Sequence, residues 1–257
     1  MKLEYISSRL MESNLLILIF FLLSIVQSIL GVGILVIGTP VLLLLEYKIP
    51  EILSLLLPIS ILTSLINFII LKGNKKNKEF DIDKKINYYF FVICLPAIFL
   101  GIYFLEIFNT IFNFKILVSI IILSSLIIKY FFSKKINLMS KFIKKIVMFV
   151  IGIIHGFTNS GGTILSLFFS NKNNSSMTEA RLNITYFYLL LASFQYLIFI
   201  FFFKIFTSKI DLIYFFIISI IGSLLGNIFV NYINEKYFRH LIEFLAFVAS
   251  IFLILNN

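Results

Sequence analysis

The sequence predicts an all-α integral membrane protein with about eight transmembrane helices in two four-helix repeats. Of its 257 residues, 60% are hydrophobic and only 13% are charged, and the mean hydropathy is +1.06, well outside the range of soluble domains. Uncharged runs such as 52–71 are long enough to cross about 30 Å of hydrocarbon as helices. Because these runs lack strict alternation and lipid offers the backbone no partner, an open sheet and a β-barrel are both excluded.

Charged residues separate the apolar segments, which we expect at 13–45, 52–71, 86–105, 112–132, 143–170, 182–203, 212–231 and 237–255. The first and fifth segments run to about 30 residues, which is longer than one crossing needs. Glycine weakens a helix and proline removes a donor. We therefore predict that both segments are broken or re-entrant, at Gly31, Gly33, Gly38 and Pro40 in the first and at Gly152, Gly156, Gly161 and Gly162 in the fifth.

The chain also resembles itself at a shift of 125 residues, which superposes Gly31 on Gly156 and Gly101 on Gly226. We predict one membrane domain, 1–257, made of a first repeat at 1–135 and a second at 136–257. Because each repeat would have four crossings, an even number, we expect both to share one orientation about an axis along the membrane normal.

The charge distribution predicts the orientation. If each apolar segment crosses the membrane once, 16 of the 22 Lys and Arg residues lie on the side of the N-terminus. The positive-inside rule then predicts a multi-pass protein of the cell membrane with both termini in the cytoplasm. The net charge of +10 resides in short loops and forms no basic stripe, so nucleic acid is not an expected partner. The expected partners are the lipid bilayer and a small anion, and a homo-oligomer stays open.

The fifth segment contains the richest polar cluster, HGFTNSGGT at 155–163. A break exposes backbone groups inside the bilayer, and the N-terminal end of a half-helix favours an anion. We predict an anion site formed by His155, Gly156, Thr158, Asn159, Ser160, Gly161, Gly162 and Thr163. The alternative is that these groups satisfy one another at a glycine-rich packing contact.

Other polar residues are less specific. Arg181, Thr185, Tyr188 and Gln195 follow one face of the sixth segment and could line a path inward. Arg181 is either an anion gate or a side chain that extends from the membrane edge to water. Ser60, Thr63, Ser64 and Asn67 share a face of the second segment, where hydrogen bonds between helices are the favoured explanation.

Several classes of function are disfavoured. The sequence has no GxxxxGK[ST] loop for ATP and no acidic residue in the middle of a segment. Neither an enzyme that uses a carboxylate pair nor a carboxylate proton relay is expected, and no metal or cofactor is predicted. His155 is the one candidate proton carrier, although a lone histidine is more often a hydrogen-bonded structural residue.

The motifs resemble the TauE/SafE family of membrane anion transporters over nearly the whole chain. They are GVGILVIGTPVLL (31–43), GFTNSGG (156–162), EAR (179–181), and IIGSLLGNIF (220–229) before KYFRHLIEFLAFVASIFLIL (236–255). Two departures from the family pattern are the incomplete glycine triplet of the first break and Thr163, where proline is common. Matched position by position, the resemblance implies that the site residues are Gly31, Gly33, Gly38, Pro40, Gly156, Asn159, Gly161, Gly162 and Arg181.

This resemblance implies transport of sulfur-containing anions such as sulfite or sulfoacetate, commonly outward. The leading hypothesis is a secondary transporter that exports a small anion across the cell membrane. Two alternatives stay open. One is anion uptake coupled to protons or cations, with His155 as the proton site, and the other is a membrane subunit or scaffold that transports nothing.

Overall fold

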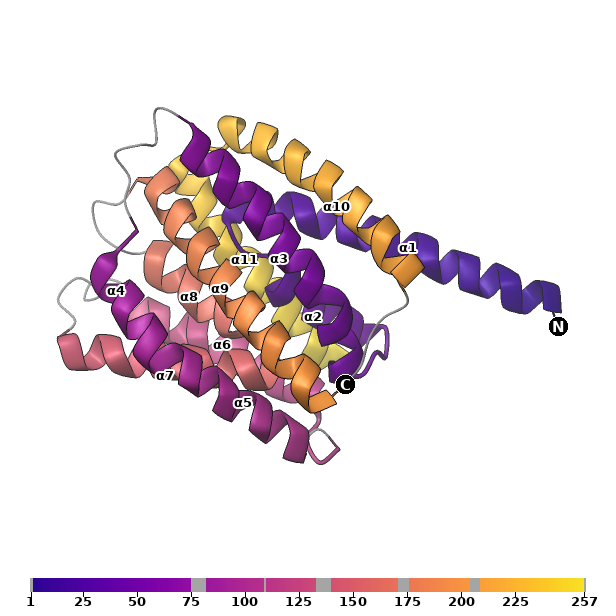
Figure 1. Ribbon diagram of the computed structural model, residues 1–257, viewed down its shortest axis with the longest axis horizontal. Coiled ribbons are helices and arrows are strands. Elements are labelled where there is room, and N and C mark those ends of the chain that lie inside the picture. The colour runs from indigo at the N-terminus through magenta and orange to yellow at the C-terminus, as the bar shows by residue number, and fades with distance from the viewer. Residues whose placement is uncertain are drawn as a thin grey trace.

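The computed structural model describes residues 2–74, 82–108, 110–132, 140–170, 176–203 and 209–256 (Figure 1). Within these ranges the secondary structure is helical, which confirms the predicted all-α class. The expected repeat boundary between 135 and 136 lies outside the described residues. The helices are α1 (Lys2–Leu30), α2 (Ile34–Leu44), α3 (Ile49–Gly73), α4 (Lys84–Tyr89), α5 (Leu95–Phe108), α6 (Phe114–Phe132), α7 (Lys141–Thr158), α8 (Gly161–Ser170), α9 (Met177–Phe203), α10 (Lys209–Phe229) and α11 (Glu235–Leu255). A π-helical turn, Phe90–Cys94, joins α4 to α5, and a 3-10 turn, Val230–Tyr232, follows α10.

The helices have the composition of a membrane protein. Among the described residues, four helices are long and apolar enough to cross a bilayer: Ile49–Gly73, Lys84–Phe108, Met177–Phe202 and Leu212–Tyr232. Shorter apolar helices occur at Asn14–Leu30, Ile34–Leu44, Phe114–Ile127 and Gly161–Ser170.

Large apolar side chains lie on the surface as well as in the core. Ile69 and Ile217 are more than half exposed, while Gln27, Asn67 and Gln195 are completely buried beside a large cluster of hydrophobic residues. An apolar exterior suits contact with lipid, and burial places the polar groups where other helices can satisfy them.

The first predicted break is present, and the chain folds back there. α1 ends at Leu30 and α2 begins at Ile34, with Gly31 between them at φ +80°. A Cβ added to Gly38 would lie 2.9 Å from Leu23 Cδ1, whereas a continuous helix would separate these residues by about 22 Å. α2 therefore packs back against α1.

The second predicted break also reverses the chain. Asn159 adopts a left-handed conformation, φ 63°, at the end of α7. A Cβ on Gly161 would meet His155 Cβ at 2.6 Å and also the carbonyl oxygen of Ile151, so the first turn of α8 lies across the last turns of α7. Neither long segment is a single crossing.

The breaks are shorter than the glycine pattern predicts. Gly38 and Pro40 lie within α2, and Gly152 and Gly156 lie within α7. Gly38 fits against Leu23 and Leu56, so its missing side chain serves helix packing. Assigning Gly38 and Pro40 to the break was wrong, because a helix tolerates both residues when neighbouring helices hold it in place.

Close glycine contacts fix the directions of two helix pairs. Gly222 of α10 faces the carbonyl oxygen of Phe21, and Gly226 faces that of Ile25, so α10 and α1 run parallel. In the same way, Gly152 of α7 faces Cys94 and Ala97, and Gly156 faces Ile98 one turn further along α5. α5 and α7 are therefore also parallel.

One end of the molecule, named here the Arg181 end, gathers the C-terminal ends of α3 and α10 with the N-terminal ends of α4 and α9. Asn74, Arg181 and Asn227 line one opening there, and the backbone N–H of Asp83 donates a 3.1 Å hydrogen bond to Asn183 Oδ1. α3 therefore runs opposite to α9.

The opposite end, named the Lys115 end, joins the start of α6 to the ends of α2 and α11. Lys115 Nζ lies 2.6 Å from Glu46 Oε1 and 3.3 Å from the carbonyl oxygen of Asn256. Figure 1 shows both chain termini toward this same side of the bundle.

The two halves of the chain consequently have opposite directions. The first half begins with α1 at the Lys115 end and finishes with α6 at the Arg181 end. The second half begins with α7 at the Arg181 end and finishes with α11 at the Lys115 end. The prediction of one shared orientation was wrong, because the first and fifth segments fold back, which leaves each half with an odd number of crossings.

Helix packing is reciprocal between the halves. The pairs α1–α10, α2–α3, α3–α10 and α2–α11 have counterparts in α5–α7, α8–α9, α5–α9 and α6–α8. Between these matched pairs, α3 packs on α9 and α6 on α11, which places these helices along the middle of the bundle.

Candidate functional site

The second break has a defined local geometry. The Asn159 backbone N–H donates to the His155 carbonyl oxygen at 2.9 Å, which closes the end of α7. Thr158 Oγ1 donates to the Ile154 carbonyl at 2.8 Å, and Ser160 Oγ donates to the Thr158 carbonyl at 3.2 Å. Two of the five predicted polar groups, the Thr158 and Ser160 hydroxyls, thus use their protons in local bonds.

The other three side chains have unpaired atoms. Both ring nitrogens of His155, Oδ1 of Asn159 and Oγ1 of Thr163 are buried and have no hydrogen-bond partner in the described part of the chain. An unpaired buried polar group costs about 1–3 kcal/mol. Several such groups at the first turn of α8 form a place for a polar ligand to supply the missing partners.

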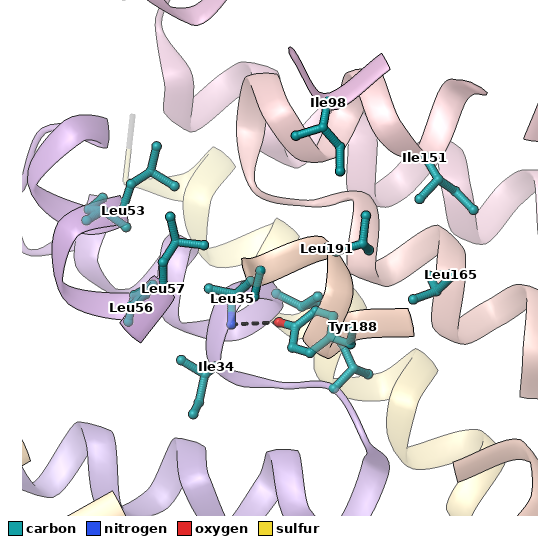
Figure 2. Packing of buried hydrophobic residues seen from close by; sticks show 14 of the residues in the cluster. Ile34, Leu35, Leu53, Leu56, Leu57, Ile98, Ile151, Leu165, Tyr188 and Leu191 are labelled. Atoms are coloured by element: carbon teal, nitrogen blue, oxygen red, sulfur yellow. Dashed lines mark hydrogen bonds between the residues drawn. The ribbon is translucent and has the colours of Figure 1, made fainter. Parts of the chain in front are cut away.

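Tyr188 of α9 connects this break to α2. Its hydroxyl accepts a 2.9 Å hydrogen bond from the Leu35 backbone N–H, drawn as the dashed line in Figure 2. Its ring lies 6.4 Å from that of His155, and a Cβ on Gly162 would lie 2.5 Å from Tyr188 Cε2. The first turns of α2 and α8 therefore meet at one aromatic side chain.

The first break is closed by protein groups. Gln27 Oε1 accepts a 3.0 Å hydrogen bond from the Ile34 backbone N–H, and Gln27 Nε2 donates to the Ser60 carbonyl at 3.0 Å and to Ser64 Oγ at 2.9 Å. Together with the Tyr188 hydroxyl, Gln27 occupies the N–H groups at the start of α2 that an anion would otherwise use. The two breaks thus differ in chemistry.

The remaining glycines of the predicted site are packing positions. A Cβ on Gly31 would lie 3.0 Å from Thr185 Oγ1, and one on Gly33 would lie 2.9 Å from the Gln27 backbone nitrogen. Gly156 faces α5 at Ile98 and so points away from the α8 first turn. Of the predicted glycines, Gly161 and Gly162 alone belong to that turn.

Arg181 lies at a different place, the C-terminal end of α1. Its Nε donates to the Ser28 carbonyl oxygen at 2.8 Å, its Nη2 donates to the same oxygen, and Nη2 donates to Asn227 Oδ1 at 2.6 Å. The cation thus faces the negative end of a helix. With 5% of its surface exposed, Arg181 does not extend freely to water.

Three residues at these sites were missed by the sequence interpretation. Thr39 accepts a 2.8 Å hydrogen bond from Asn159 Nδ2, Gln27 caps α2, and Asn227 binds Arg181. Gln27 had a signal, since a glutamine inside an apolar segment needs a partner. Thr39 and Asn227 lacked a comparable signal, because threonine and asparagine fit many helix contacts.

The whole chain was compared with known proteins. The family described as Sulfite exporter TauE/SafE matches residues 16–253. The chain belongs to the TauE/SafE family. No curated protein and no solved structure matches it. This match confirms the resemblance seen in the motifs. TauE/SafE proteins are membrane transporters rather than enzymes, which agrees with the apolar exterior of the structure.

Proposed function

We propose that this protein is a secondary transporter that exports a small sulfur-containing anion, such as sulfite or sulfoacetate, across the cell membrane. The observation that carries the proposal is the group of buried, unpaired atoms of His155, Asn159 and Thr163 at the start of α8. Membership of a sulfite exporter family supports the substrate class.

The proposed site binds an oxyanion mainly through neutral donors. The Thr163 hydroxyl can donate, one ring nitrogen of neutral His155 carries a proton, and the first turn of α8 presents the positive end of its dipole. Gly161 and Gly162 let this turn pack closely against α7 and Tyr188, because a Cβ at either position would meet those groups. Hydrogen bonds to a charged ligand contribute about 1.5–3 kcal/mol each.

We infer that residues 1–135 and 136–257 are two inverted repeats. The reciprocal helix pairs and the opposite directions of the halves support this inference. Inverted repeats that enclose a site of broken helices suit alternating access, in which one group of helices rocks against the other.

The orientation follows from the revised helix directions. Of the fifteen Lys and Arg residues that the structure describes, five lie at the Lys115 end and ten at the Arg181 end. The five are Lys2, Arg9, Lys48, Lys115 and Lys209. We place the Arg181 end in the cytoplasm by the positive-inside rule and both termini outside, which reverses the orientation predicted with single crossings. An inside-negative potential then favours outward anion movement by about 2.3 kcal/mol per charge per 100 mV.

Proton-coupled uptake is the second candidate, and the unpaired ring nitrogens of His155 favour it. It predicts that His155→Gln, which keeps a hydrogen-bonding side chain but cannot carry a proton, transports without pH dependence. If the pH profile of His155→Gln matches that of the wild type, proton coupling through this residue is wrong.

The proposed function is tested by counterflow in proteoliposomes with sulfite, sulfate, thiosulfate and sulfoacetate compared side by side. We expect Thr163→Val to lower flux by about 10- to 100-fold, because it removes one hydrogen bond to a charged ligand. Asn159→Ala should also lower flux, because it removes the hydrogen bond that joins the second break to Thr39. Thr163→Ser keeps the hydroxyl, and Ser124→Ala removes an exposed hydroxyl on α6; both should retain flux. Full flux in folded Asn159→Ala and Thr163→Val would place the site elsewhere, and absence of flux in the wild type would favour a scaffold.

A further inference from the structure

The Arg181 end contains an opening of about 270 Å³ between α3, α9 and α10. Its polar lining consists of Asn74, Thr178, Arg181, Asn227 and Asn231. The opening is separate from the second break, because its lining comes from the helix ends rather than from α7 or α8.

Arg181 is a buried cation held by neutral groups. Its hydrogen bonds go to the Ser28 carbonyl and the Asn227 side-chain amide, and no carboxylate within the described residues contacts it. These hydrogen bonds use Nε and Nη2 of the guanidinium. A buried charge is expensive unless paired, so the opening offers an anion a charge to pair with.

Asn227 holds the guanidinium in this position. Its Oδ1 accepts from Arg181 Nη2, while its Nδ2 donates to Asn67 Oδ1 at 2.6 Å and to the Ser223 carbonyl at 2.9 Å. Because Asn227 is fixed on both sides of its amide, Arg181 keeps one geometry at the opening.

The repeat-related position at the other end carries no charge. At the shift of 125 residues Arg181 corresponds to Leu56, which is completely buried. The guanidinium is thus present at one of the two related positions, at the end that also has most of the described lysines.

We propose that this opening is a second anion site, which loads the substrate from the cytoplasm before it reaches the second break. The proposal rests on the proposed transport function and adds a residue-level reason for outward movement. The ligand class is a small oxyanion with at least one negative charge, bound by a guanidinium at the bottom and by asparagine amides at the rim.

The experiment uses Thr178→Cys in a Cys94→Ala background, reacted with a membrane-impermeant maleimide in inside-out and right-side-out vesicles. Sulfoacetate is the test anion because sulfite itself reacts with maleimides. We expect labelling in inside-out vesicles and at least about fivefold slower labelling with saturating sulfoacetate. Protection should persist with Arg181→Lys and disappear with Arg181→Gln.

Two substitutions of one residue at the edge of the opening test the same site without altering a buried group. Asn231 is exposed, so Asn231→Asp should raise the half-protecting sulfoacetate concentration severalfold and Asn231→Lys should lower it. Equal protection in all these variants, or labelling from the outside alone, would overturn the loading site. Asn159→Ala separates the two proposals, since it should lose flux while protection of Thr178→Cys remains.

Discussion

Asn159 Nδ2 donates a 2.8 Å hydrogen bond to Thr39 Oγ1, which joins the second break to the helix that follows the first break. The two residues are 120 positions apart and come from opposite halves of the chain. This bond orients the Asn159 amide so that Nδ2 is used by the protein, while Oδ1 has no hydrogen-bond partner among the described residues.

Replacing Thr39 by valine should therefore disturb both stability and transport. Valine has the shape of threonine but cannot accept the Asn159 proton, so a buried donor loses its partner, at a cost of about 1–3 kcal/mol. Chemical unfolding in detergent measures the loss, and counterflow measures the flux. Thr39→Ser is the matched control and should retain both. Equal stability of Thr39→Val and the wild type would mean that the bond contributes nothing.

Tyr188→Phe should weaken the start of α2 while leaving the packing of the ring unchanged. The Leu35 backbone N–H loses its acceptor, at a cost of about 1–3 kcal/mol. Hydrogen exchange at the α2 first turn should accelerate relative to the wild type. Tyr214→Phe, which changes a side chain that is 61% exposed, should leave the exchange of α2 unchanged. Unaltered exchange in Tyr188→Phe would show that the hydroxyl does not hold α2.

Gly156→Ala should destabilise the contact between α5 and α7. The added methyl group would overlap the carbonyl oxygen of Ile98, and forcing an extra carbon into a packed contact costs about 1–3 kcal/mol or more. We expect a lower yield of monodisperse protein and a lower unfolding midpoint. Gly73→Ala is the control, because nothing lies within 4 Å of the added carbon there. A wild-type midpoint for Gly156→Ala would contradict the close approach of these helices.

The all-α class and the presence of a break in the first and fifth apolar segments could be predicted from the sequence, because hydrocarbon thickness and glycine chemistry act locally. The direction of the chain after each break could not. After Gly31 the chain could continue in the direction of α1 or fold back against it. The outcome depends on the contact of Gly38 with Leu23 and Leu56, and such a contact has no local signature in the sequence. The wrong prediction that both halves share one orientation followed directly from this one point.

The candidate site was partly predictable for a similar reason. A cluster of polar residues in an apolar segment indicated the second break, but its sequence could not separate Thr158 and Ser160, which bond locally, from Thr163, which has an unpaired hydroxyl. Likewise, the first break resembles the second in glycine content, yet Gln27 and Tyr188 close it. Those caps come from other turns and another helix, so only the fold brings them together.

The proposed orientation, with the Arg181 end in the cytoplasm, gives the last prediction. In a Cys94→Ala background, Asn256→Cys lies at the Lys115 end, because Asn256 contacts Lys115. Lys141→Cys lies at the Arg181 end, because α7 runs parallel to α5 and Lys145 Nζ lies 5.8 Å from the centre of the Tyr89 ring on α4. Because ten of the fifteen described Lys and Arg residues lie at the Arg181 end, a membrane-impermeant maleimide should label Asn256→Cys on intact cells and Lys141→Cys only in inside-out vesicles.

Labelling of Lys141→Cys on intact cells, with Asn256→Cys protected, would instead restore the orientation with cytoplasmic termini. Such a result would also turn the Arg181 opening toward the outside, where it would receive anions for uptake. The labelling pattern therefore tests which side of the membrane the Arg181 opening faces before any substrate is identified.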